Sequence, residues 1–96
     1  MSSLNVNQTV VFKELSSGQV ATITTTRGFS VLTSGDVATI EQYDVNGAVQ
    51  SSLSLPDGKS LEVEADGGSL LSNIKVTAGA SATVYITMLN GSISVV

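Results

Sequence analysis

One ten-residue phrase occurs four times in this chain, at 14–23, 31–40, 54–63 and 75–84. Each copy reads an aliphatic residue, two small or turn-forming residues, Gly, a variable residue, and a run that ends in Ile or Val. Glycine can take the positive φ of a tight turn, so each copy predicts a strand, a turn and a second strand. We expect at least three of Gly18, Gly35, Gly58 and Gly79 to join consecutive antiparallel strands, in a sheet built of hairpins.

Strand signals continue along almost the whole chain, and no window places apolar residues at helical spacing over three turns. The turn residues Asn46-Gly47 favour a two-residue type I′ hairpin, and Pro56-Asp57-Gly58 favour a type I turn followed by a left-handed glycine. We expect about eight strands from nine candidate segments, at 9–15, 19–26, 29–33, 36–43, 48–55, 60–65, 69–76, 81–89 and 92–96.

Alternation separates the two faces of these strands. The acids Glu62, Glu64 and Asp66 share one parity and should face solvent, whereas Val10–Phe12 are consecutive apolar residues that predict a bulge or burial on both sides. The fold class we predict is a single small antiparallel β-sandwich, either jelly-roll or immunoglobulin-like. Its inward positions, aligned over the four copies, are Leu15, Ala21, Ile23, Leu32, Ala38, Ile40, Leu55, Leu61, Val63, Val76, Ala82 and Val84, and among these Ile23, Ile40, Val63 and Val84 should share one core.

The length of 96 residues suffices for one hydrophobic core. We therefore expect one β-sandwich domain at 9–96, preceded at 1–8 by a polar arm or lead-in strand in which Leu4 and Val6 follow Met1 as the apolar residues. The start has neither the basic region nor the apolar run of a secretory signal, so none is expected. No stretch approaches the roughly 20 apolar residues of a membrane span.

Composition argues against several classes of function. The chain has four cations against eight acids, which disfavours nucleic-acid binding because phosphates require a basic surface. Cysteine and histidine are both absent, so thiolate metal sites are excluded, and the commonest general base is missing. The acids Asp44, Asp57, Glu62, Glu64 and Asp66 lack the spacing of a calcium loop. We expect no enzymatic activity, no cofactor and no metal.

The surface must be built largely from Ser and Thr, because charged residues make up 12% of the chain, about half the usual share. Hydroxyl groups lose their water at a lower cost than charges, so such a surface can be buried against another protein. Arg27 and Phe29 flank Gly28 at a turn and can form an exposed anchor, although core packing is the favoured role of Phe29, because Phe is often buried. The candidate interface residues are Leu4, Val6, Arg27 and Phe29.

The phrase at Val76-Thr77-Ala78-Gly79-Ala80-Ser81-Ala82-Thr83-Val84 resembles a strand-turn-strand element of immunoglobulin-like and related sandwiches. Over 9–96, the short length, the richness in Ser, Thr, Val, Ala and Gly, and the absence of Cys and His resemble small bacteriophage structural proteins, most closely capsid decoration (cement) proteins. That resemblance implies a domain that sits as a dimer or trimer on the outside of a phage head. It implies virion localisation after synthesis in the host cytoplasm, and contact with the major capsid protein lattice through residues 1–8.

A rival from another class is a receptor- or glycan-binding module of a phage tail or fibre. That function needs exposed aromatic side chains or a calcium loop, and the chain has no Trp, two Tyr and two Phe. An enzyme is the third alternative. No role for nucleic acid or membranes is expected.

Overall fold

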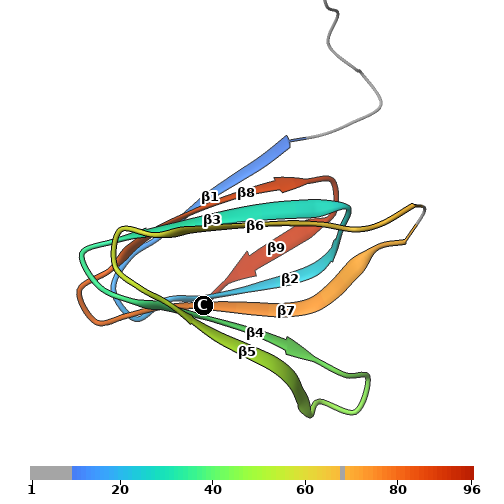
Figure 1. The fold of residues 1–96 in the computed structure, drawn as a ribbon, viewed down its shortest axis with the longest axis horizontal. Helices are drawn as coiled ribbons and strands as arrows, with labels where there is room; N and C mark the ends of the chain where they lie inside the picture. Colours follow the sequence, from blue (N-terminus) through green and yellow to red (C-terminus); the bar gives the residue numbers. More distant parts are fainter. Residues whose placement is uncertain (1–9, 68) are drawn as a thin grey trace, which may run out of the picture.

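The computed structural model describes residues 10–67 and 69–96 of the chain. These residues form nine strands in two antiparallel sheets that face each other (Figure 1). Sheet A has the order β1 (Val10–Leu15), β8 (Thr83–Leu89), β3 (Gly28–Ser34) and β6 (Ser60–Glu64). Sheet B has the order β5 (Val49–Leu55), β4 (Ala38–Tyr43), β7 (Leu71–Ala78), β2 (Val20–Thr26) and β9 (Ser92–Val95). The predicted all-β sandwich is confirmed, with nine strands in place of about eight.

The strand order identifies the sandwich as a jelly roll. Strands β4 and β5 are consecutive neighbours in sheet B, whereas every other connection between successive strands crosses from one sheet to the other. The order β1-β8-β3-β6 facing β2-β7-β4-β5 is that of a jelly roll, with β9 added beside β2. No helix in the described part of the chain is long and apolar enough to span a membrane.

The four repeated phrases form the four corners at one end of the sandwich, on the left in Figure 1. Gly18, Gly35, Gly58 and Gly79 lie in the connections from β1 to β2, β3 to β4, β5 to β6 and β7 to β8. The predicted place of all four glycines between consecutive strands is confirmed. Each of these connections crosses between sheets, however, so the predicted sheet built of hairpins is wrong. A strand-turn-strand pattern is the same whether the second strand returns to its own sheet or enters the facing one.

The corner glycines are needed for two different reasons. Gly18, Gly35 and Gly58 have φ of 73°, 98° and 79°, the left-handed region that a side chain disfavours. Gly79 does not have a positive φ, but a Cβ atom there would lie 2.5 Å from the carbonyl oxygen of Val37. Close packing of neighbouring corners therefore requires this glycine.

Hydrogen bonds join the corners into one row across the end of the molecule. The Asp36 carboxylate accepts the N–H of Val37 at 2.8 Å and that of Ser81, in the next corner, at 3.2 Å. Further bonds between corners run from Ala78 N–H to Gln19 O at 2.9 Å, from Gly79 N–H to Val37 O at 3.0 Å, from Gly58 N–H to Thr33 O at 2.9 Å, and from Gly35 N–H to Asp57 Oδ1 at 2.7 Å.

The predicted core is confirmed at its centre and wrong at one position. Ile23, Ile40 and Val84 are buried, and Val63 is half-buried against the same cluster. Leu32, however, is 43% exposed. Strand β3 continues past it to Ser34, so Thr33 takes the inward position and donates its hydroxyl hydrogen to the carbonyl of Asp36 at 2.8 Å.

The predicted irregularity of the first strand is also wrong. Strand β1 pairs with β8 in continuous register from Val10 opposite Leu89 to Leu15 opposite Val84. Val11 therefore points inward and is half-buried, while Val10 and Phe12 point outward into solvent. Three consecutive apolar residues here mean an exposed apolar surface, not burial on both sides.

The β4–β5 hairpin closes with a three-residue loop in place of the predicted type I′ turn. Gly47 has a φ of 86°, but Asn46 does not have the positive φ that type I′ requires of both central residues. The Asp44 carboxylate accepts the N–H groups of Asn46 and Ala48, each at 2.9 Å. These two bonds favour the longer loop.

Candidate interaction face

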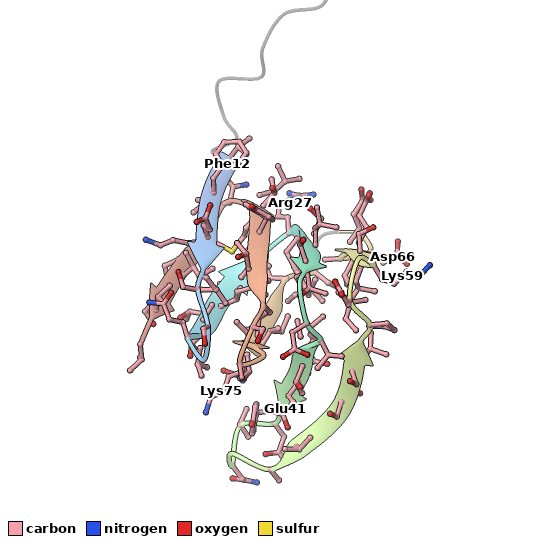
Figure 2. The ribbon with its side chains drawn as sticks, turned by 90° about the vertical axis from the view of Figure 1, so that its left-hand side faces the viewer. Phe12, Arg27, Glu41, Lys59, Asp66 and Lys75 are labelled. Atoms are coloured by element: carbon pink, nitrogen blue, oxygen red, sulfur yellow. The ribbon has the colours of Figure 1, made fainter. Side chains whose placement is uncertain are left out.

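Exposed apolar side chains gather on the outer face of sheet A. Residues that alternate with the core along β1, β8 and β3 point to this face, because side chains alternate along a strand. Four of them are large and exposed: Phe12 by 72%, Tyr85 by 46%, Val10 by 45% and Leu32 by 43%. We call these four residues the apolar strip. Figure 2 shows Phe12 on one broad side of the sandwich and Glu41 and Lys75 on the other.

The sheet register places the members of the apolar strip side by side. Tyr85 lies opposite Leu32 on one neighbouring strand and opposite Glu14 on the other. Phe12 lies opposite Thr87 and is therefore diagonal to Tyr85, at a Cβ separation of about 7–8 Å that two rings can bridge. A shallow hollow of about 340 Å³ lies among Phe12, Glu14, Tyr85 and Thr87.

Carboxylates surround the apolar strip. Glu14, Glu62 and Glu64 are exposed on strands β1 and β6, on the same outer face. Lys13, the one cation on the four strands of sheet A, lies opposite the buried Ile86 and so has the inward parity. A partner for this face needs an apolar centre and a basic rim.

The structure separates the predicted interface residues. Arg27 is exposed in the β2–β3 connection, where its backbone N–H donates to the backbone carbonyl of Leu89 at 3.1 Å. Leu89 also lies opposite Val10, so Arg27 stands at the end of sheet A where the apolar strip begins. Phe29 is 5% exposed and lies opposite Val63 and Met88. The favoured place of Phe29 in the core is confirmed, and its alternative role as an exposed interface anchor is wrong. Leu4 and Val6 lie outside the described residues.

Sequence reasoning missed Phe12 and Tyr85. Tyr85 lies between Val84 and Ile86, which the alternation in this strand assigns to the inward face. The same alternation would have placed Tyr85 on the outward face. Phe12 shares its parity with Val10 and, in the sequence, with Leu4 and Val6. The shared parity of Val10 and Phe12, on the side opposite to Val11, was therefore a usable signal.

The outer face of sheet B pairs its own polar groups. Tyr43 donates its hydroxyl hydrogen to Glu41 Oε1 at 3.0 Å, and Lys75 Nζ lies 4.8 Å from the centre of the Tyr43 ring. The hydrogen bond to Glu41 is the main cause that raises the pKa of Tyr43 above its usual value, with smaller effects from desolvation and from the Glu41 charge. This face satisfies its aromatic and charged groups internally.

The described residues contain no candidate metal centre. In 10–67 and 69–96 no group of three or more Asp, Glu, His or Cys side chains could hold a metal ion. The buried side-chain polar atoms of these residues all have hydrogen-bond partners. Thr26, for example, donates its hydroxyl hydrogen to the carbonyl of Leu89 at 2.7 Å.

Comparisons with known proteins found no matching family model and no matching curated protein. Among solved structures, the chain is similar to a de novo designed double-stranded β-helix, with 14% identity and a TM-score of 0.49 over 85% of this chain and 99% of the other. It is also similar to a Bacillus endospore appendage protein that forms disulfide-linked pili, with 16% identity and a TM-score of 0.47 over 88% of this chain and 86% of the other.

Proposed function

We propose that this protein is a non-enzymatic structural protein that attaches as an oligomer to a larger protein lattice, and that the lattice is the outside of a phage capsid. The observation that carries this proposal is the apolar strip. Phe12 is 72% exposed on an edge strand, next to a second aromatic ring and two aliphatic side chains. Covering this surface with a partner protein removes apolar area from water and so lowers the free energy.

Other features fit the same role. Three carboxylates rim the strip and select a partner by charge. Arg27 adds a cation at the end of sheet A where Val10 starts strand β1, and Arg is a frequent anchor in interfaces. In the sequence, Leu4 and Val6 add two apolar residues shortly before the strip, separated from it by the polar Gln8, which supports attachment by residues 1–8 together with this face.

Co-sedimentation with intact phage particles tests the proposal. Phe12→Asp should weaken attachment about tenfold or more, as expected for the loss of a central aromatic anchor. Val45→Asp is the matched control, because Val45 is 92% exposed in the β4–β5 loop, outside the strip. Deleting Met1 to Gln8 should also weaken attachment and leave the β-sheet circular dichroism unchanged. Binding that is absent for the wild type, or equal for Phe12→Asp and the wild type, would overturn the proposal.

A second candidate is glycan or receptor binding by a phage tail or fibre module. Phe12 and Tyr85 flank a hollow that also contains the Glu14 carboxylate, and two rings beside a hydrogen-bond acceptor can hold a sugar. Binding of oligosaccharides that Phe12→Asp and Tyr85→Ala both abolish, without attachment to particles, would favour this candidate.

A further inference from the structure

The four edge strands of the two sheets differ in how well they resist pairing with another chain. Natural edges are protected by charged side chains, short length, bulges or proline. Strand β6 has five residues that include Glu62 and Glu64, β9 has four residues, and β1 carries Lys13 at an inward position. Strand β5 has seven residues, Val-Gln-Ser-Ser-Leu-Ser-Leu, with no charge, no proline and no glycine.

The β5 edge is nearly unprotected. Every residue from Val49 to Ser54 is exposed. The one irregularity is a register shift against β4 near Gln50, at the start of the strand. From Ser51 to Leu55 the strand is regularly paired with β4. No other strand of the described residues pairs with its other side, which therefore presents a row of main-chain donors and acceptors.

An apolar groove opens between the two sheets beside this edge. Its volume is about 200 Å³, and its apolar lining comes from Phe29, Ile40, Leu53, Leu61, Val63, Leu71 and Ile74. Leu53 lies opposite the buried Ile40 and so points inward, yet it is 44% exposed. Figure 1 shows the β4–β5 hairpin leaning away from sheet A. The exposure of Ser51 and Leu53, which have the inward parity, shows that the inner face of β5 is partly uncovered.

We propose that β5 is a self-pairing edge, and that β5 of a second copy adds to it antiparallel across a two-fold axis. The pairing joins two five-stranded sheets into one continuous sheet and brings the two apolar grooves together. This inference rests on the proposed function in one respect only, that the protein acts as an oligomer. It identifies the interface, which is separate from the apolar strip.

The sequence of β5 is compatible with itself in this arrangement. A two-fold axis at Ser52 places Ser51 opposite Leu53 of the second copy on the inner face, within the regular part of the strand. Beyond this pair, Gln50 at the register shift meets Ser54 of the second copy. The nearest charge on β4 is Glu41, opposite Ser52. Two copies of Glu41 would stand three strand spacings apart, about 14 Å, which exceeds the physiological Debye length of about 8 Å.

A single introduced thiol tests the pairing, because the chain contains no cysteine. Residues that face each other in an antiparallel pair have Cα atoms about 4.5–5.5 Å apart, within the range for a disulfide. Ser52→Cys should form a covalent dimer rapidly under mild oxidation at low micromolar concentration. Ser94→Cys is the matched control, an exposed serine on β9 at the other edge of sheet B. Equal rates for the two variants would overturn the proposal.

Complementary charges give a second, non-covalent test. Ser52→Lys and Ser52→Glu should each weaken dimerisation by up to about fivefold in sedimentation, because like charges then face each other across the axis. An equimolar mixture of the two should restore the dimer, and Ser94→Lys should dimerise as the wild type does. Failure of the mixture to restore the dimer would overturn self-pairing.

These measurements use the protein without phage particles, so a failure of capsid attachment does not affect them. Conversely, Phe12→Asp should leave the dimer intact, since Phe12 lies on the outer face of sheet A. A dimer lost in Phe12→Asp would place the self-association on the apolar strip and overturn the β5 interface.

Discussion

The two ends of the sandwich are built in different ways. At one end, four copies of one phrase make four similar corners that hydrogen-bond to one another. At the other end, the connections have unrelated sequences: a single residue at Arg27, the loop at 44–48, the segment between β6 and β7, and the pair Asn90-Gly91. Arg27 and Val10, at the beginning of the apolar strip, belong to the unrepeated end, whereas Leu32 of the strip lies within the repeated phrase at 31–40. Repetition in this chain marks architecture: each copy makes a corner, and the outward side chains of a copy can still contact a partner.

The largest expected effect comes from the unrepeated end, at Gly91. A Cβ atom there would lie 1.3 Å from the carbonyl oxygen of Thr25, and φ is +89°. Gly91→Ala should therefore destabilise the fold by about 3–5 kcal/mol, since strand β2 would have to move away from the β8–β9 connection. Gly47→Ala is the control, because φ is +86° there with no atom within 4 Å, and it should cost about 1 kcal/mol. Urea unfolding measures both, and equal costs would contradict this account.

An intermediate effect is expected at the corner end, at Asp36. Its carboxylate accepts two N–H groups, of Val37 and of Ser81, whereas Asp57 accepts one, of Gly35. Asp36→Ala should cost about 2 kcal/mol and Asp57→Ala about 1 kcal/mol, because each lost bond involves a charged acceptor at a partly solvated site. Thermal unfolding of both variants checks the order. If Asp57→Ala costs more, the row of corners is not held together at Asp36.

The sequence predicted strands better than it predicted their partners. Strand limits follow from alternation and turn residues, which are local, and every one of the nine candidate segments became a strand. Whether the second strand pairs with the first or enters the facing sheet depends on contacts between strands that are distant in the sequence. The corner at Gly18 could therefore not be distinguished from a hairpin. The same limit applies to Leu53, whose parity is inward although the groove beside it stays open.

Candidate site residues were harder to predict, for a related reason. A hydrophobic residue in a β-strand is assumed to be buried, and this assumption hid Phe12, whose neighbour Val11 takes the inward position. Phe29 shows the converse, because its place beside a turn suggested exposure while its parity with Val31 placed it in the core. Parity was the more reliable guide at both positions.

The smallest effect is expected at the Tyr43–Glu41 pair, on the face that satisfies its own groups. The pKa of Tyr43 is raised above the usual value of about 10, mainly by the hydrogen bond to Glu41. Because the folded state holds the phenol proton more tightly than the unfolded state does, this stabilisation is fully present below the unfolded pKa and is lost as the pH rises through the folded pKa.

Glu41→Gln in a Tyr85→Phe background should lower the pKa of Tyr43 toward the ordinary value, as followed by tyrosinate absorbance. Stability at neutral pH should change little, because a solvent-exposed pair contributes little. An unchanged titration of Tyr43 in Glu41→Gln would show that the bond to Glu41 does not form in solution, and that this face, like the apolar strip, leaves an aromatic side chain available to a partner.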